Sequence, residues 1–234
     1  MEPRFFPPSR RLVIVLANYA VLVFLDVSFS SARAYFLSTP IEHGGLGMNP
    51  RTIGIILGAA GPIHGMAQAF LFRHVHKRVD MRTIYAVCMV AYVPTYLSLP
   101  VMNALARQVG HVTPLVWGLI VLMELLCTFA YTAFSMCLHL YSALQICLIS
   151  SAGCVYVYIT QAAPSRTAMG RTHVAAQTIY SLMGGIGPVS VTALMGASAE
   201  YNLVGGTLAY LVMAAVSIIG VALAFLLPKS IRRR

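Results

Sequence analysis

Six long apolar runs, separated by short polar breaks, constrain the fold of this chain more than any other feature. The runs occupy residues 12–36, 52–72, 84–105, 115–160, 175–197 and 203–227. A transmembrane helix needs about 20 mostly apolar residues, and each run reaches that length. Only 9% of the residues are charged, whereas a soluble domain carries about 25%. We therefore predict an all-α, polytopic transmembrane helix bundle of six spans, surrounded by the lipid bilayer.

The basic residues favour one orientation of these spans. The fourth run is about twice as long as one crossing requires at about 1.5 Å per residue. If it crosses once, thirteen of the sixteen Lys and Arg residues lie on one side of the membrane. Arg51 and Arg107 lie on the other side, and Arg33 lies inside the first span. If it crosses twice, the two sides carry nearly equal numbers. Because cytosolic loops are rich in Lys and Arg, we predict six crossings with both termini in the cytosol.

The surplus length within residues 115–160 can be arranged in several ways. No Gly or Pro interrupts residues 129–151, so a tight hairpin is not indicated. One over-long span, a re-entrant segment, two spans or an aberrant insertion near residues 136–145 all stay open. The expected domains are a cytosolic tail at 1–11, a six-helix transmembrane domain at 12–227 and a basic cytosolic tail at 228–234.

Two of the six spans share a cluster of glycine and proline near their middle. If the spans form two triplets, these are the second helices of each triplet, at 52–72 and 175–197. The clusters are Gly58, Gly61 and Pro62 in one span and Gly184, Gly187 and Pro188 in the other. Matched interruptions of this kind are typical of the moving, cavity-lining helices of inverted-repeat transporters. The alternative is that the small residues only allow close helix packing.

Ionisable side chains inside the first span are candidates for function, because a charge at the centre of a membrane helix costs about 2.5–3.5 kcal/mol on insertion scales. Asp26 lies well inside this span, and Arg33 follows two turns later on the same face. The pair could line a water-filled path in which Asp26 binds a proton or a cationic group. The alternatives are local pairing, or an Arg33 side chain that extends toward the membrane surface.

Further polar candidates lie in the second and fourth runs. Glu124 lies near the middle of the membrane in the fourth run, and it is a candidate for the same proton or substrate path. His64 and Gln68 are four residues apart in the second run, so they share one helix face. A histidine satisfied by a neighbouring helix is the simpler interpretation of that pair.

Several classes of function lack their usual residues. No nucleophile elbow, zinc-protease, phosphate-loop or dinucleotide-binding motif is present, so we predict no enzyme and no cofactor. The five cysteines lie in apolar runs without metal-ligand spacing, so we predict no metal site. The net charge of +10 arises from short loops between spans, which indicates a membrane protein and no nucleic-acid partner.

Short motifs along the chain point to a family. The first two runs and the break between them contain Asn18-Tyr19-Ala20, Phe24-Leu25-Asp26, Ser38-Thr39-Pro40-Ile41-Glu42, Gly44-Gly45-Leu46-Gly47 and Ile53-Gly54. Later segments contain Tyr158-Ile159-Thr160, Ala163-Pro164-Ser165-Arg166, Gly170, Ala176-Gln177-Thr178 and Gly187-Pro188. In this order they resemble the second half of fungal major facilitator superfamily transporters, in the drug:proton antiporter-like branch related to zinc-induced facilitators. The resemblance runs over most of the chain.

The chain also departs from that family. Only the carboxy-terminal six of the family's twelve helices are represented, and the fourth run is too long for the corresponding helix. The segment from Gly170 to Val174 replaces a Gly-Ala-Thr-Asn-Gly motif that is usual in the family. A retained intron or a truncated gene model would account for both the length and the missing half.

The resemblance implies transmembrane secondary transport of a small organic solute, by proton-coupled export. Since the substrate path in that fold lies between two six-helix halves, the chain would need the missing amino-terminal half or a second copy of itself. The resemblance favours the plasma or vacuolar membrane. The alternative is a non-transporting protein, such as a truncated remnant or a helix-bundle partner subunit.

Overall fold

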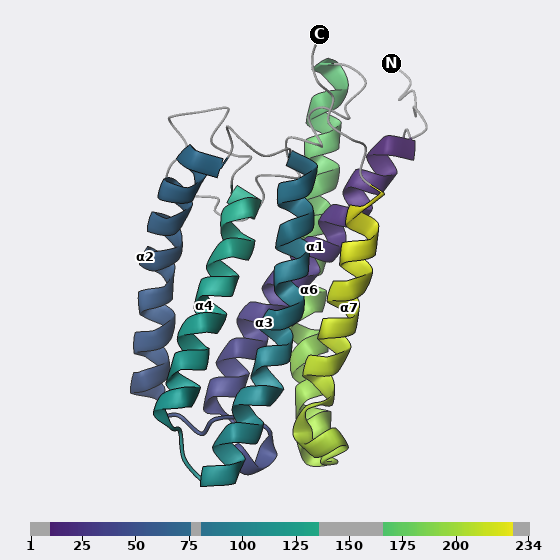
Figure 1. Cartoon of the computed structure of the whole chain (residues 1–234). Helices are drawn as coiled ribbons and strands as arrows, with labels where there is room; N and C mark the ends of the chain where they lie inside the picture. Colours follow the sequence, from purple (N-terminus) through teal and green to yellow (C-terminus); the bar gives the residue numbers. More distant parts are fainter. Residues whose placement is uncertain (1–9, 76–80, 136–165, 227–234) are drawn as a thin grey trace.

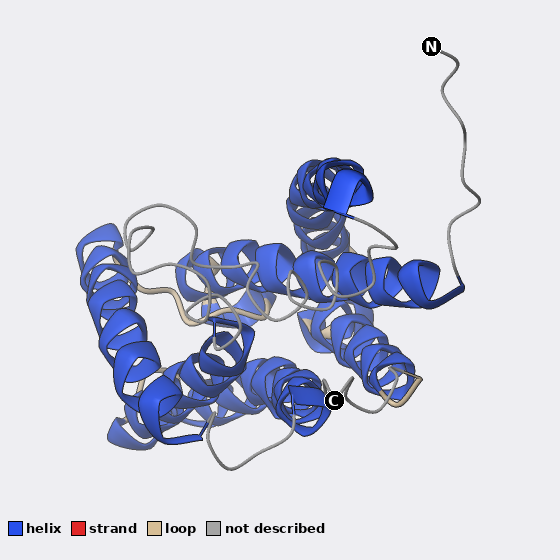
Figure 2. Cartoon of the chain, turned by 90° about the horizontal axis from the view of Figure 1, so that it is seen from above, coloured by secondary structure: helices blue, strands red, loops and turns tan. Residues whose placement is uncertain are grey.

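The computed structural model describes residues 10–75, 81–135 and 166–226, and this part of the chain is helical. Its α-helices are α1 (Arg10–Ser38), α2 (Pro50–Val75), α3 (Met81–Val109), α4 (Pro114–Ser135), α6 (Arg166–Glu200) and α7 (Leu208–Ala224). Short 3-10 helices at Ile41–His43 and Leu203–Gly206 precede α2 and α7. The described residues form helices and loops without a strand (Figure 2). The predicted all-α fold class is therefore confirmed.

The helices stand side by side and alternate in direction along the chain (Figure 1). Helix α4 ends, and α6 begins, at the same end of the bundle. The arrangement of the surplus within the fourth run falls on residues 136–165, outside the described part. The number of membrane crossings stays a prediction.

Three segments of the described helices are long and apolar enough to cross a membrane, by length and composition: Val13–Ser38, Tyr85–Val109 and Val174–Glu200. Two shorter apolar helices, Pro114–Thr128 and Leu208–Ala224, accompany them. These helices agree with an integral membrane protein. Apolar side chains remain exposed along them, including Val101, Val121 and Val189, as is expected of surfaces that face lipid or another polypeptide.

Two helix boundaries differ from the apolar runs of the sequence. Helix α6 begins at Arg166, inside the polar break that precedes the fifth run. Polar residues end the apolar part of a span, but the helix itself can continue through them. Helix α7 begins at Leu208, later than the start of the sixth run near residue 203. The preceding residues Val204, Gly205 and Gly206 have positive φ values of 52°, 68° and 81°, which an α-helix cannot accommodate.

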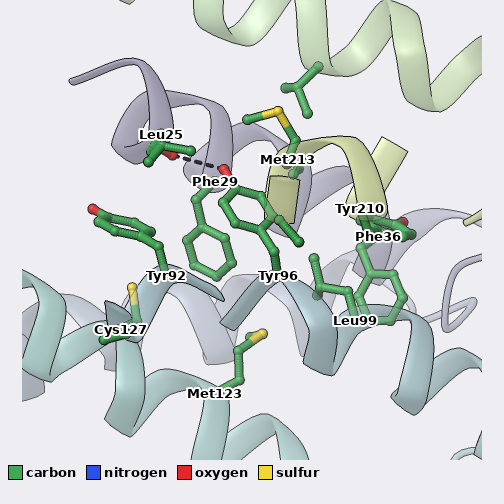
Figure 3. Packing of buried hydrophobic residues seen from close by; sticks show 14 of the residues in the cluster. Leu25, Phe29, Phe36, Tyr92, Tyr96, Leu99, Met123, Cys127, Tyr210 and Met213 are labelled. Carbon is green, nitrogen blue, oxygen red and sulfur yellow. Dashed lines mark hydrogen bonds between the residues drawn. The ribbon is translucent and has the colours of Figure 1, made fainter. Parts of the chain in front are cut away.

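The core lies between α1, α3 and α7, and α6 covers another side of α1. Edge-to-face aromatic pairs connect the helices: the ring centroids of Phe29 and Tyr96 are 5.5 Å apart, and those of Phe36 and Tyr210 are 5.6 Å apart. The Tyr96 hydroxyl donates a hydrogen bond of 2.9 Å to the Leu25 carbonyl (Figure 3). Because this hydroxyl has a partner in an apolar core, the tyrosine fixes the position of α3 on α1.

The end of α3 joins two turns that are far apart in sequence. Asn103 donates hydrogen bonds to the carbonyls of Ile41 and Gly45, at 2.9 and 2.8 Å. Arg107 donates to the carbonyls of Ile41, Glu42 and Gly205, at 3.1, 2.7 and 2.7 Å. We call Asn103, Arg107 and the turns 41–45 and 203–206 the turn junction. It ties the α1–α2 connection to the α6–α7 connection.

The turn junction predicts that Arg107→Ala destabilises the protein. The variant loses three hydrogen bonds, and we expect the free energy of unfolding to fall by about 2 kcal/mol, since one bond to a charged group contributes about 1.5–3 kcal/mol. Thermal unfolding of the purified chain in detergent measures this loss. Arg51→Ala is the control, because Arg51 is exposed at the start of α2. Equal stability of the two variants would contradict a structural role for the junction.

Candidate polar site between three helices

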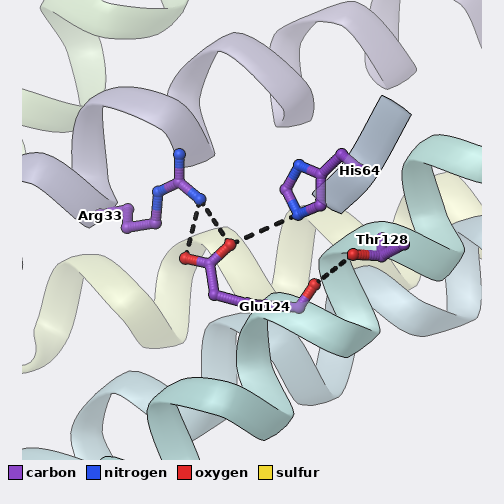
Figure 4. A network of polar contacts seen from close by, with 4 residues as sticks. All are labelled: Arg33, His64, Glu124 and Thr128. Atoms are coloured by element: carbon purple, nitrogen blue, oxygen red, sulfur yellow. Dashed lines mark hydrogen bonds and ion pairs between the residues drawn. The ribbon is translucent and has the colours of Figure 1, made fainter. Parts of the chain in front are cut away.

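A largely buried ionic network connects α1, α2 and α4 (Figure 4). Nη1 of Arg33 on α1 donates hydrogen bonds of 2.8 Å to both carboxylate oxygens of Glu124 on α4. Nε2 of His64 on α2 lies 3.4 Å from Oε2 of the same carboxylate. The side chains of Arg33, His64 and Glu124 are 14%, 13% and 16% exposed. Three of the predicted path residues therefore meet at one carboxylate.

Neighbouring residues hold two members of this network in place. The guanidinium carbon of Arg33 lies 5.9 Å from the centroid of the Phe29 ring, one turn earlier on α1, which is within range of a cation–π contact. Thr128, one turn after Glu124 on α4, donates a 2.7 Å hydrogen bond to the Glu124 carbonyl. The ion pair therefore has an aromatic support on α1 and a backbone contact on α4.

The charges of the network are mutually dependent. Arg33 is permanently charged, Glu124 balances it, and His64 lies beside the same carboxylate. An isolated charge in a low-dielectric interior is expensive, so the loss of one partner leaves the other uncompensated. The network can thus hold an anionic group at Arg33 or exchange a proton at His64 and Glu124.

Asp26 occupies a separate position in the bundle. Its side chain is buried, with 7% of the residue exposed, and its Oδ1 accepts a 3.2 Å hydrogen bond from the Tyr92 hydroxyl of α3. Although Asp26 and Arg33 share a face of α1, Arg33 pairs with Glu124. The first span therefore contributes to two polar contacts, with α3 and with α4, instead of one continuous pair.

The remaining predicted residues fall into two groups. Gly187 packs closely on α1, because a Cβ atom there would lie 2.7 Å from Cγ2 of Val27 and 3.0 Å from the Ser28 hydroxyl. In contrast, no atom of the described residues lies within 4 Å of a Cβ built on Gly58, Gly61 or Gly184. Close packing explains Gly187 but not the other three.

The two predicted helix prolines do not end their helices. Pro62 lies inside α2 and Pro188 inside α6, and both helices are continuous. Pro62 is exposed and Pro188 is half-buried. The side chain of Gln68 lies outside the described part of the structure.

Sequence reasoning missed several residues of these contacts. Tyr92 and Thr128 carry no signal that separates them from other polar residues of apolar helices. Phe29 could have been noticed, because residues four apart on a helix are neighbours and Arg33 follows it at that spacing. Among the described residues no group of three or more His, Cys, Asp or Glu side chains could hold a metal ion.

The sequence was compared with known proteins. It is 23% identical over 225 residues to the major facilitator-type transporter psiT2 of Psilocybe cubensis, which covers 92% of this chain and 39% of that protein. It is 24% identical over 209 residues to the major facilitator superfamily multidrug transporter mfsB of Aspergillus fumigatus, which covers 84% of this chain and 31% of that protein. These matches support membership of the major facilitator superfamily. The psiT2 protein of Psilocybe cyanescens matches similarly, at 23% identity over 92% of this chain.

The major facilitator relatives are named as transporters, so they support membrane transport as the general function. The chain spans less than two-fifths of the length of these curated relatives. No family model matches the sequence, and no solved structure matches it. Residue roles in this chain therefore have to be argued from its own geometry.

A double-mutant cycle tests whether Arg33 and Glu124 stabilise each other. We expect Arg33→Gln and Glu124→Gln each to lower the free energy of unfolding by about 3 kcal/mol, because each leaves a buried charge unpaired. The double variant should lose at least about 1 kcal/mol less than the sum of the single losses. Thermal unfolding in detergent gives all four stabilities. Additive losses would show that the pair is not coupled.

Proposed function

We propose that this chain forms the carboxy-terminal six-helix half of a major facilitator-type secondary transporter that exports a small organic solute, driven by protons. The observation that carries the proposal is the ion pair of Arg33 and Glu124, joined by His64, inside an otherwise apolar bundle. Ionisable groups at this depth mark substrate and proton pathways in membrane proteins, because their burial is expensive. The named transporter relatives support the same class of function.

Two carboxylates offer places for the coupled proton. The Asp26 carboxylate is buried next to the Tyr92 hydroxyl, so a proton there removes the cost of burying a charge. A proton on Glu124 would weaken its hold on Arg33, whereas a proton on His64 would strengthen the attraction between His64 and Glu124. Each site therefore has two states that differ in pairing, as a proton-driven conformational change requires.

A second six-helix unit would complete the substrate path. Helix α2 supports this idea, since Ala60 is the one buried residue between Arg51 and Met66. Helix α6 also supports it. Only 22% of the most apolar stretch within Val174–Glu200 is buried, compared with 50% of the corresponding stretch within Val13–Ser38 of α1. The partner in this proposal is the missing amino-terminal half or a second copy of the chain. Six spans with cytosolic termini, in the plasma or vacuolar membrane, belong to the same proposal.

The transport proposal predicts loss of proton coupling in two variants. The purified chain is reconstituted in liposomes with a pH-sensitive dye inside, and proton flux is recorded as small organic acids and amines are added. We expect Asp26→Asn and Glu124→Gln to reduce the solute-induced proton flux about tenfold or more, a change of about 1.4 kcal/mol in barrier height. Glu200→Gln is the control, because Glu200 is exposed at the end of α6.

Two results would count against the transport proposal. One is a wild-type protein that moves no protons with any of these solutes when its second six-helix unit, the amino-terminal half or a second copy of the chain, is present in the liposomes. The other is a wild-type flux that Asp26→Asn and Glu124→Gln both leave unchanged. The second result would also indicate that the buried ionic groups serve only to hold the helices together, as in a non-transporting partner subunit.

The partner proposal predicts the size of the native species. An antibody against residues 229–234 should detect either a polypeptide well above 25.3 kDa, or a chain of that mass that migrates as a complex on a native gel. A denaturing blot gives the chain mass, and chemical cross-linking in membranes before extraction gives the assembly. A 25.3 kDa monomer in both measurements would contradict the need for a second unit.

A further inference from the structure

Arg33 uses only one of its nitrogen atoms to hold Glu124. Both hydrogen bonds to the carboxylate come from Nη1. Nε is buried and has no hydrogen-bond partner among the described residues. In Figure 4 the edge of the guanidinium that carries Nε and Nη2 is turned away from Glu124. Within the described part of the chain, the Nε–H group of Arg33 is therefore left without an acceptor.

A buried N–H group without an acceptor costs free energy, so native structures rarely leave one. The described carboxylates do not supply the acceptor. Glu124 lies on the opposite edge, and Asp26 lies two helical turns away, about 10 Å along α1. Glu42 and Glu200 are exposed at or next to the turns that connect the helices. The acceptor must therefore come from outside this set of residues.

The shape of the free edge indicates the chemistry of the missing group. Two parallel N–H donors on a planar guanidinium match the two oxygens of a carboxylate or phosphate, and such pairs are the strongest hydrogen bonds of arginine. The Arg33 side chain keeps 14% of its surface exposed. Nε itself is covered by the surrounding chain, so this edge becomes available to a ligand when the helices rearrange, as they do between the states of a transporter.

We propose that the Nε–Nη2 edge of Arg33 binds an oxyanion of the transported solute, which makes the substrate a small organic carboxylate or phosphate ester. This assignment rests on the proposed transport function, since it names the substrate class of the same site. Phe29 holds the guanidinium from one face and Glu124 holds its other edge. The free edge is therefore already oriented before the ligand arrives, which lowers the entropic cost of binding.

Binding to the purified full chain in detergent tests this assignment. The probes are benzoate and phenyl phosphate, with benzamide and benzyltrimethylammonium as neutral and cationic counterparts of similar size, and calorimetry measures each affinity. We expect the two anions to bind at least about tenfold more tightly than their counterparts. Arg33→Lys keeps the charge but loses the fork, so it should weaken anion binding about tenfold. Arg51→Lys, at an exposed position, should leave binding unchanged.

The comparison of probes on the wild-type chain does not depend on the folding of any variant. Equal binding of benzamide and benzoate, or anion affinity that Arg33→Lys does not change, would overturn the assignment. A lipid phosphate is the other source of an oxyanion. Nanodiscs of phosphatidylcholine, with and without phosphatidylglycerol, separate the two sources: loss of phenyl phosphate binding only when phosphatidylglycerol is present would assign the edge to lipid and overturn the solute proposal.

The outcome also separates this inference from the transport proposal. Arg33-dependent anion binding without proton flux in liposomes would support the binding site and contradict proton-coupled transport. Proton flux that depends on Asp26 and Glu124, together with no preference for anions, would support transport and overturn the anion assignment.

Discussion

The hydrogen-bonded ion pair between Arg33 and Glu124 is the interaction on which the arrangement of α1, α2 and α4 depends. Helix α2 packs mainly on α4 and touches α1 only slightly, so the polar side chains carry much of the connection between these helices. The pair is short and symmetric, with 2.8 Å to each carboxylate oxygen. Because both charges are largely buried, separation of these helices would leave each charge uncompensated.

Other contacts of α1 depend on different forces. The helix packs on α6 through Gly187, and on α3 through the Tyr96 hydroxyl and the Phe29 ring. The turn junction adds hydrogen bonds from side chains to backbone carbonyls at one end of α3. The bundle therefore combines helices joined by apolar packing and hydroxyl hydrogen bonds with helices joined by an ion pair.

Much of this architecture could be predicted from the sequence, but the contacts could not. The apolar runs predict the helices, because a membrane demands a minimum apolar length, and burial costs single out Asp26, Arg33, His64 and Glu124. Their partners depend on how the helices rotate against each other, which the residues of one helix do not determine. Arg33 therefore pairs with α4 rather than with Asp26, and Tyr92 and Thr128 gave no signal in advance. The late start of α7 depends on backbone angles at Val204 to Gly206, which contact between the turns imposes.

The glycine clusters show how geometry divides two sequence patterns that look alike. The clusters of α2 and α6 occupy matching places in the two triplets predicted from the sequence, yet among these glycines only Gly187 has a described neighbour that would exclude a side chain. At Gly58, Gly61 and Gly184 the absence of a side chain has no packing reason within the described residues. Glycine does not by itself stabilise a helix, because each glycine lowers helix stability by about 1 kcal/mol relative to alanine. The proposed second six-helix unit, or a solute that passes between the two units, would account for these three positions by approaching the backbone from outside.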